Sequence, residues 1–140
     1  MLRDMSGLAR PQAPRRRSTA QRVAAARAAI ENLRPSELAA ELGSPSGAAA
    51  LLIDVRSSEE HQAGSIRGAI SVPRGLIELT LGTVLDPARR IIVYCDNGAR
   101  SALAAEALYE LGYHDVAHLD GGLAAWSAAG RAVTVGRGDG

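Results

Sequence analysis

The residues with the clearest chemical potential form one stretch at residues 95–101, Cys-Asp-Asn-Gly-Ala-Arg-Ser, which holds the only cysteine of the 140-residue chain. An apolar run at residues 91–94 precedes it, and apolar residues at three- and four-residue spacings follow it. These patterns predict a strand, a six-residue turn and a helix that begins near Ser101. Such an arrangement places a side chain at the carboxyl edge of a parallel sheet, where α/β proteins hold their ligands.

Three features of this turn favour an anion, either the ionised sulfur or a bound oxyanion. A helix that begins near Ser101 leaves unpaired N–H groups in its first turn, and its dipole is positive there. Gly98 can adopt backbone angles that other residues avoid, so several loop N–H groups can point inward. Arg100 adds a fixed positive charge. Although most lone cysteines are buried and inert, Gly98 and Arg100 at this spacing favour a reactive thiol at Cys95.

Other kinds of site have less support. The histidines His61, His114 and His118 have no cysteine or carboxylate at the spacing of metal ligands, so we expect no metal. No Gly-rich nucleotide fingerprint follows the first predicted strand, and we expect no cofactor. Ser101 has no nearby histidine and acid in the sequence, which argues against a hydrolase triad. We therefore expect His114 and His118 to be surface residues or residues with satisfied hydrogen bonds.

The elements that must position Cys95 alternate between strands and helices. Apolar runs predict strands at residues 51–55, 69–72, 91–94 and 115–119. Helices are predicted at residues 35–42, around 59–60, at 76–81, from 101 to a stop at Gly112, and from 122 to a stop at Gly130. This alternation predicts an α/β domain built on a parallel sheet.

The two ends of the chain differ from this central part. Residues 1–17 are polar and Arg-rich, and we interpret them as a basic, disordered leader; a nucleic-acid arm, a membrane-surface arm and a transit-like leader are alternatives. Ser18 or Thr19 caps a helix predicted for residues 18–33, which offers a basic face to a possible protein partner. We expect the domain itself to span residues 34–133 and residues 134–140 to form a flexible tail.

Composition excludes several function classes. The chain is 46% hydrophobic and 22% charged, which is typical of a globular domain, and no apolar run approaches the ~20 residues needed to cross a bilayer. A net charge of +1 and 3% aromatic residues argue against a nucleic-acid surface. A functional free thiol fits a reducing cytosol. We therefore expect a cytoplasmic protein with neither nucleic-acid nor membrane partners.

Four segments in chain order give a more specific indication. They are Leu-Ile-Asp-Val-Arg at 52–56 with Glu60, Gly-Ser-Ile-Arg-Gly-Ala-Ile at 64–70 with Pro73, Cys-x-x-Gly-x-Arg-Ser at 95–101, and Leu-Asp-Gly-Gly at 119–122 with Trp126. With these segments, the chain from about residue 33 to residue 133 resembles a single-domain rhodanese, a family of sulfurtransferases. The resemblance implies a rhodanese-like α/β fold with a central parallel sheet of about five strands, helices on both faces and, here, an N-terminal helical extension.

The resemblance also implies the chemistry. Cys95 would accept a sulfane sulfur from a small-molecule donor such as thiosulfate, form a persulfide, and pass the sulfur to cyanide or a cellular thiol. Arg100 would contact the substrate anion or clamp the loop through an acid such as Glu60. Asp54, Arg56 and Glu60 would support the structure. The implied substrate-binding residues, with the amides of residues 96–100 around the outer sulfur, are Asp96, Asn97, Gly98, Ala99, Arg100 and Ser101.

Two positions depart from the family pattern. The usual Gly-His-Ile is Gly64-Ser65-Ile66 here, and the first loop position, often basic in thiosulfate-using relatives, is Asp96. An acidic side chain beside the sulfur would disfavour the thiolate and repel a dianionic donor, unless it points into solvent and is screened.

Two other functions remain as alternatives. Phosphatases and arsenate reductases of this fold place five residues between the cysteine and the arginine, whereas Cys95 and Arg100 enclose four. The tighter loop suits one sulfur atom better than a phosphoryl group. A rhodanese-fold module that only binds or regulates is the other alternative, although such modules often lose the cysteine that this chain keeps.

Overall fold

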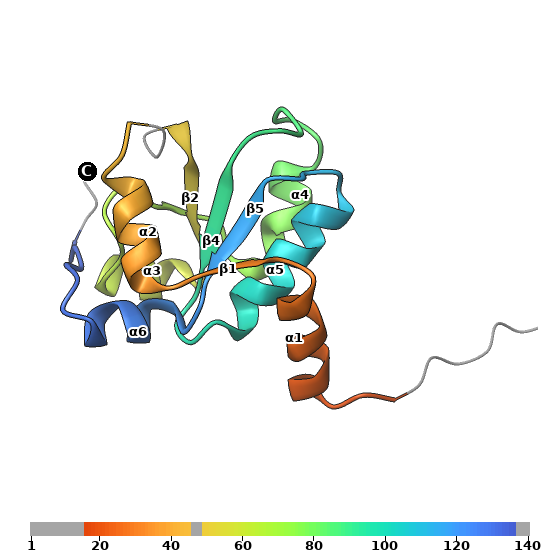
Figure 1. Cartoon of the computed structure of the whole chain (residues 1–140), viewed down its shortest axis with the longest axis horizontal. Helices are drawn as coiled ribbons and strands as arrows, with labels where there is room; N and C mark the ends of the chain where they lie inside the picture. Colours follow the sequence, from red (N-terminus) through yellow and green to blue (C-terminus); the bar gives the residue numbers. More distant parts are fainter. Residues whose placement is uncertain (1–15, 46–48, 137–140) are drawn as a thin grey trace, which may run out of the picture.

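One five-stranded parallel sheet forms the centre of the protein (Figure 1). The computed structural model describes residues 16–45 and 49–136. The strands lie in the order β1-β5-β4-β2-β3, and each neighbouring pair is parallel, as the sequence predicts. β4 is therefore the middle strand. The strands are β1 (Glu31–Leu33), β2 (Leu51–Asp54), β3 (Ile70–Ser71), β4 (Ile91–Tyr94) and β5 (Val116–Leu119).

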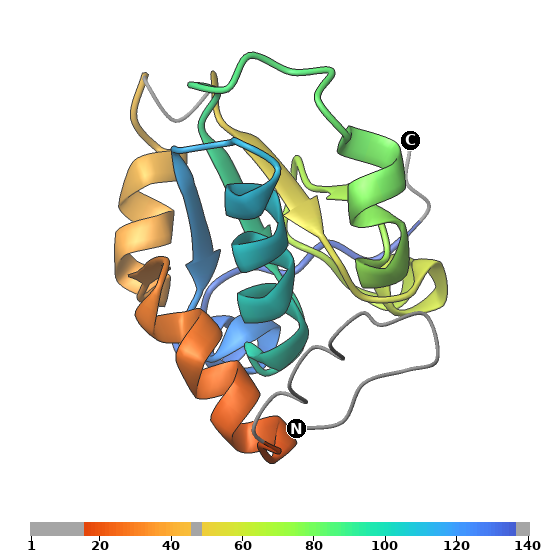
Figure 2. The ribbon, with the colours of Figure 1, turned by 90° about the vertical axis from the view of Figure 1, so that its right-hand side faces the viewer.

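Helices cover both faces of this sheet. Figure 2 shows α1, α5 and α4 in front of one face, whereas α2 and α6 lie on the opposite side in Figure 1. The expected α/β fold, with a sheet of about five strands and helices on both faces, is confirmed. The helices are α1 (Thr19–Ala28), α2 (Pro35–Leu42), α3 (Ser58–Ala63), the 3-10 helix η2 (Arg74–Leu76), α4 (Ile77–Leu81), α5 (Ala99–Glu110) and α6 (Gly122–Ala128).

Successive residues of β4 point into two separate cores. Ile91, Val93 and Cys95 belong to the core on the α5 side, whereas Ile92 and Tyr94 belong to the core on the α2 and α6 side. All five are fully buried. A strand covered on both faces needs apolar residues at every position, which explains why this run is continuous and not alternating.

The N-terminal helix is shorter than the sequence predicts. The expected helix at residues 18–33 ends at Ala28, and Glu31–Leu33 forms β1, which pairs with β5. The Asn32 side chain donates hydrogen bonds to the carbonyls of Arg27 and Ile30, which holds the chain in a turn after the helix. Leu33 is buried by this pairing. Residues 31–33 are therefore part of the sheet and not of an extension.

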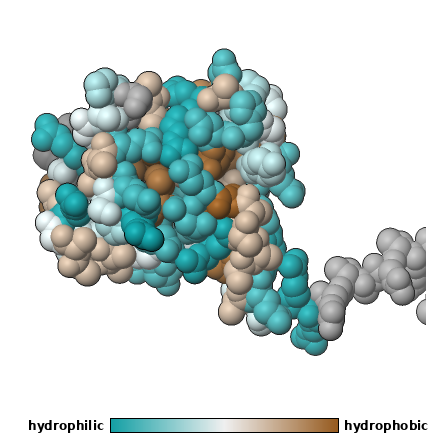
Figure 3. Space-filling view, in the orientation of Figure 1, coloured by the Kyte–Doolittle hydropathy of each residue, from teal (hydrophilic) through white to brown (hydrophobic). Residues whose placement is uncertain are grey.

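α1 itself packs on the domain. Its Ala26 is fully buried, and Arg22 forms an ion pair with Glu106 of α5. Figure 3 shows this face of the molecule largely covered by hydrophilic residues, with α1 in the pale brown of its alanines.

The expected flexible tail at residues 134–140 begins with an ordered contact. Thr134 and Ser65 exchange two backbone hydrogen bonds, and the amide of Gly136 donates to the carbonyl of Gln62. These bonds hold residues 134–136 against the end of α3 and the loop after it. The rest of the tail, and the leader up to residue 15, lie outside the described residues.

None of the helices that the structure describes is long and apolar enough to span a membrane.

Candidate active site

Cys95 lies directly after β4, at the carboxyl edge of the middle strand, where the sequence places it. Its side chain is fully buried. The following turn is tighter than predicted, because α5 begins at Ala99 and not near Ser101. Gly98 precedes the helix with a φ of 100°, in the left-handed region that favours glycine. A Cβ at Gly98 would also lie 3.3 Å from the backbone nitrogen of Gly121, so the turn has little room for a side chain.

Two backbone amides donate to the Cys95 sulfur. The amide nitrogen of Gly98 lies 3.1 Å from Sγ, and that of Ser101 lies 3.3 Å away. The amide of Ala99 instead donates to the Asn97 side chain at 3.1 Å. The N–H groups at the start of α5 thus stabilise negative charge on the sulfur.

Of the residues expected to bind substrate, Asp96 and Asn97 are exposed, whereas Gly98 and Ser101 are buried beside the sulfur. The carbonyl of Asp96 accepts a hydrogen bond from the amide of Ala124. A Cβ at Gly122 would lie 2.5 Å from the same carbonyl oxygen. The start of α6 therefore packs against the Cys95 loop, which accounts for the second glycine of the Leu-Asp-Gly-Gly segment.

Arg100 forms a two-pronged ion pair with Glu60. The two Nη–Oε distances are 2.9 and 3.2 Å, and the pair joins the first turn of α5 to α3. Glu60 also accepts a hydrogen bond from the Ser57 amide in the capping box of α3. The Arg100 hydrogen bonds, with that amide, lower the pKa of Glu60 to about 2. The resemblance allows Arg100 either to contact the substrate anion or to clamp the loop. The ion pair with Glu60 is the contact that a clamp requires.

The expected supporting residues Asp54 and Arg56 form a buried ion pair at the end of β2. The guanidinium donates to both carboxylate oxygens, at 3.0 and 2.7 Å, and also to the carbonyl of Gly64. His61 of α3 lies 2.9 Å from the same carboxylate. These contacts tie β2 to α3 and to the loop after it, and none of them includes the Cys95 loop.

The buried partner of Ser101 is a residue that the sequence does not predict. His118 of β5 is fully buried, and its Nδ1 lies 2.9 Å from the Ser101 hydroxyl. Its Nε2 lies 2.7 Å from Oδ1 of Asn32 in β1. Burial lowers the pKa of His118 to about 4. His118 thus lies next to Ser101 in space, although the two residues are distant in the sequence. Of the two expectations for His118, a surface residue or a residue with satisfied hydrogen bonds, the second is confirmed.

The pairing register of the strands, if it had been known, would have located the contact between Ser101 and His118. His118 is paired with Asn32 on one side and with Val93 on the other, so it lies two residues before the level of Cys95 in the neighbouring strand. That register depends on which strands are neighbours. The separation of 17 positions between Ser101 and His118 gives no hint of it.

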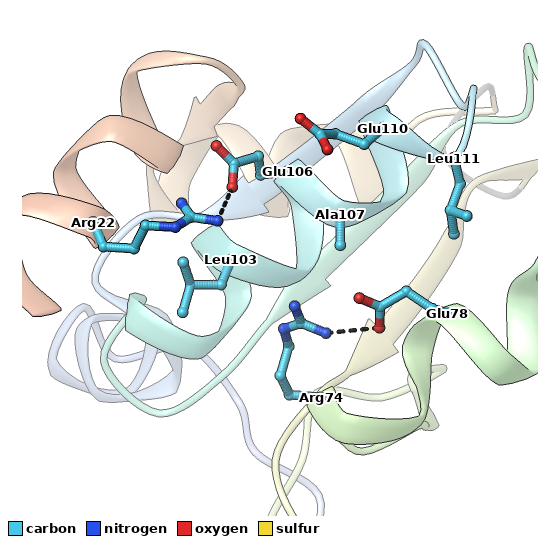
Figure 4. A pocket seen from close by; sticks show the side chains of 8 residues that line it. All are labelled: Arg22, Arg74, Glu78, Leu103, Glu106, Ala107, Glu110 and Leu111. Carbon is cyan, nitrogen blue, oxygen red and sulfur yellow. Dashed lines mark hydrogen bonds and ion pairs between the residues drawn. The ribbon is translucent and has the colours of Figure 1, made fainter. Parts of the chain in front are cut away.

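Two of the cavities that border α5 bear on the site. One of about 230 Å³ borders the Cys95 loop and is lined by Asn97, Gly98 and Ala99, with α1 and Asp120 forming the other walls. A larger one, of about 320 Å³, lies on the outer side of α5 (Figure 4). Its Arg22 and Arg74 are already paired with Glu106 and Glu78, as the dashed lines in Figure 4 show. None of its lining residues belongs to residues 95–101, whereas three residues of that loop line the smaller cavity.

Within residues 16–45 and 49–136 there is no group of three or more His, Cys, Asp or Glu side chains that could hold a metal ion.

A known family of domains matches most of the chain. The family model for the rhodanese-like domain matches residues 34–129. The thiosulfate sulfurtransferase GlpE of Shewanella oneidensis is 35% identical over 78 residues, which are 56% of this chain and 76% of that protein. The probable adenylyltransferase/sulfurtransferase MoeZ of Mycobacterium tuberculosis is 40% identical over 83 residues, or 59% of this chain, but the match covers only 21% of that longer protein.

A solved structure shares the fold. It is a protein of unknown function from Rhodopseudomonas palustris, described as a possible tyrosine phosphatase, with a TM-score of 0.73 and 29% identity over 90% of this chain and 100% of that one. The family model covers well over half of the chain, and the named relatives support sulfur transfer as the general class of activity. This chain belongs to the rhodanese-like domain family.

Proposed function

We propose that the protein is a sulfurtransferase that carries a sulfane sulfur on Cys95, with thiosulfate as donor and cyanide or a cellular thiol as acceptor. The observation that supports this most directly is the pair of N–H groups, from Gly98 and Ser101, that donate to the Cys95 sulfur at the start of α5. These groups favour a thiolate before the reaction and an anionic persulfide after it.

The reaction proceeds in two half-steps. The Cys95 thiolate attacks the outer sulfur of thiosulfate, a new S–S bond forms, and the S–S bond of thiosulfate breaks with release of sulfite. The acceptor then attacks the outer sulfur of the persulfide, and the Cys95 thiolate leaves with the electron pair of that bond. With cyanide as acceptor, the product is thiocyanate. The N–H groups of Gly98 and Ser101 stabilise the leaving thiolate in this second step.

The similarity to the thiosulfate sulfurtransferase GlpE of Shewanella oneidensis supports thiosulfate as the donor. Asp96 argues in the other direction, since its charge would repel a dianion. Its side chain is exposed, however, so water and salt screen it. Thiosulfate therefore stays as the proposed donor, with a polysulfide or persulfide donor as the competitor that the experiment must include.

The similarity to a possible tyrosine phosphatase makes phosphate-ester hydrolysis the rival to test. The loop argues against it. Four residues separate Cys95 from Arg100, the Arg100 guanidinium is engaged by Glu60, and the two sulfur-facing amides already lie close to Sγ. A tetrahedral phosphoryl group needs a wider ring of donors than this loop offers.

The test uses the fact that Cys95 is the only cysteine. The protein is incubated with thiosulfate or with a polysulfide, and intact-mass spectrometry measures whether one sulfur atom is added. Cyanide is then supplied and thiocyanate is quantified. We expect the added sulfur and the thiocyanate with the native protein and neither with Cys95→Ser. No thiocyanate above the Cys95→Ser level with either donor would overturn the proposal, and hydrolysis of p-nitrophenyl phosphate would favour the phosphatase.

A further inference from the structure

A chain of hydrogen bonds runs from the Cys95 sulfur into the interior of the protein. Sγ of Cys95 lies 3.4 Å from the hydroxyl of Ser101, which lies 2.9 Å from Nδ1 of His118, whose Nε2 lies 2.7 Å from Oδ1 of Asn32. Cys95, Ser101 and His118 are all fully buried. The chain joins four elements, namely β4, α5, β5 and β1.

The direction of each hydrogen bond follows from Asn32. Its side-chain nitrogen donates to the carbonyls of Arg27 and Ile30, at 2.9 and 3.1 Å. Its oxygen therefore faces His118 and can only accept, so Nε2 of His118 must carry a hydrogen. This assignment does not depend on the histidine alone, because the two carbonyls determine the orientation of the amide.

The other ring nitrogen of His118 is then free to accept. Burial lowers the pKa of His118 to about 4, so the ring is neutral near pH 7 and Nδ1 carries no hydrogen. The Ser101 hydroxyl has two acceptors, Nδ1 at 2.9 Å and the carbonyl of Gly98 at 3.3 Å. It donates to Nδ1, the nearer of the two, and its oxygen presents a lone pair to the S–H group of Cys95. Every donor along the chain points away from the sulfur.

From this arrangement we propose that Ser101 and His118 form a proton path that takes up the proton of the Cys95 thiol, with Asn32 holding His118 in the accepting tautomer. The S–H bond breaks as a new O–H bond forms on Ser101, and the original O–H bond of Ser101 breaks as an N–H bond forms at Nδ1 of His118. The products are a thiolate and an imidazolium, and no electron is transferred.

The surroundings of the path suit this step. On the thiolate side, the amides of Gly98 and Ser101 donate to the sulfur. On the imidazolium side, both ring N–H groups have an oxygen to donate to, at Ser101 and at Asn32. Burial by itself opposes protonation of His118, so the imidazolium depends on the negative charge that forms on the sulfur in the same step. Cys-His-Asn sets in other folds use a histidine in this way. Here a serine hydroxyl stands between the sulfur and the ring.

The charged groups around the path largely pair with one another. Asp120 raises the pKa of His118 and Arg27 lowers it, and these two side chains form an ion pair at the surface. Near the sulfur, Arg100 pairs with Glu60, while Asp96 is exposed. Burial is therefore the main influence on the pKa of His118. A new charge at position 32 would be the strongest electrostatic influence on it.

The path deepens the proposed function, because it explains how Cys95 would become the thiolate that sulfur transfer needs, yet its test requires no sulfur donor. With a single cysteine, the ultraviolet absorbance of the thiolate near 240 nm, measured against Cys95→Ser, reports Cys95 alone. The quantity compared is the pH at which half of this absorbance appears. If the protein transferred no sulfur but this titration behaved as expected, the proton path would stand and the proposed function would fall. If the protein transferred sulfur but the titration did not behave as expected, the proposed function would stand and the path would fall.

His118→Leu removes the acceptor. We expect the half-point to move up by at least one pH unit, which is roughly tenfold less thiolate at a given pH below it. If His118 were only a packing residue, its removal would leave the Ser101 hydroxyl to donate either to the carbonyl of Gly98 or to the thiolate, and the half-point would stay the same or move down. An unchanged or lower half-point therefore overturns the path. The matched control is His114→Leu, an exposed histidine just before β5, which should leave the half-point unchanged.

Asn32→Asp is an independent test, because here the path predicts that the half-point moves down and not up. A carboxylate on Nε2 makes Nδ1 a stronger base, so the path predicts a lower half-point, whereas a negative charge acting without the path would raise it. Ser101→Ala removes the bridge and should raise the half-point; in that background Asn32→Asp should no longer lower it. Circular dichroism identifies any variant that does not fold, and if His118→Leu is one of these, the two Asn32→Asp comparisons decide the question. An upward shift with Asn32→Asp in the native background contradicts the proposal.

Discussion

The Cys95 loop is held from two sides, and the two supports differ in kind. On one side, Arg100 and Glu60 form an ion pair whose side chains are 42% and 37% exposed. On the other side, Ser101, His118 and Asn32 form a chain of neutral hydrogen bonds in which His118 is fully buried. Both supports join the start of α5 to another element, α3 in the first case and β5 in the second.

The difference follows from solvent access. A charged pair is tolerable where water still reaches it, but an unpaired charge in the interior costs far more than a neutral group. A buried support therefore has to use neutral groups, and each of their donors needs a matched acceptor. The surface pair can fix the position of the loop, whereas only the buried chain can also determine where a proton resides.

Breaking the buried support should have the largest effect on stability. His118→Leu leaves Oδ1 of Asn32 without the donor that His118 provides, whereas the Ser101 hydroxyl keeps the carbonyl of Gly98 as an acceptor. Leaving one buried group unsatisfied costs about 1–3 kcal/mol. We expect the free energy of unfolding to fall by an amount in this range, measured by urea denaturation at pH 7. In His114→Leu, the free energy of unfolding should fall by less than about 0.5 kcal/mol, as is usual for surface changes. Equal losses in the two variants would show that the chain of hydrogen bonds contributes little.

The two supports should also fail in different pH ranges. The pKa of His118 is lowered to about 4 from an ordinary 6.5, so its unfolded form binds the proton more tightly, and the associated stability is complete above pH 6.5 and is lost as the pH falls toward 4. The pKa of Glu60 is lowered to about 2 from 4.5, so its contribution is complete above pH 4.5 and is lost as the pH falls toward 2.

Melting temperatures measured from pH 7 to pH 3 test this assignment. His118→Leu should flatten the pH dependence between 6.5 and 4, and Glu60→Gln should flatten only the part below 4.5. If Glu60→Gln flattened the pH dependence between 6.5 and 4.5, that result would contradict the assignment of this range to His118.

Breaking the ion pair of Arg100 and Glu60 should lower the free energy of unfolding by less than breaking the buried chain of hydrogen bonds. Glu60→Gln keeps the shape of the side chain and removes its charge, and exposed ion pairs contribute about 0.2–1 kcal/mol. We expect a loss of stability below about 1 kcal/mol and a several-fold slower loading of sulfur, because the start of α5 is less firmly held. Both effects should shrink at high salt. An effect of Glu60→Gln larger than that of His118→Leu at neutral pH would reverse the comparison.

The smallest effect should come from Asp96, the exposed acid of the loop. Asp96→Asn removes the repulsion of a dianionic donor, and screening should limit the gain in the rate of thiosulfate loading to a few-fold at low ionic strength. Loading from a neutral persulfide donor is the control, and it should change less. A large gain that persists at high salt would mean that the Asp96 side chain points into the site.

The fold and the position of Cys95 were predictable because they depend on local patterns. Continuous apolar runs specify strands buried on both faces, and the glycine between β4 and α5 specifies a tight turn at the end of the middle strand. The end of the first helix was not predictable in this way. Residues 29–33 carry apolar positions at helical spacing, and the chain forms a strand there because β5 offers an edge to pair with and Asn32 holds the preceding turn.

The sequence by itself determined the place of the single thiol and its local support, which consists of a glycine that allows a left-handed turn and a helix that follows at once. These depend on neighbours within a few residues. The tertiary structure alone decided which distant groups surround that thiol. Glu60 reaches Arg100 from 40 residues away, and His118 and Asn32 reach Ser101 only because β1, β5 and β4 are adjacent in the sheet. Strand order and register set such contacts, and no short-range pattern encodes them.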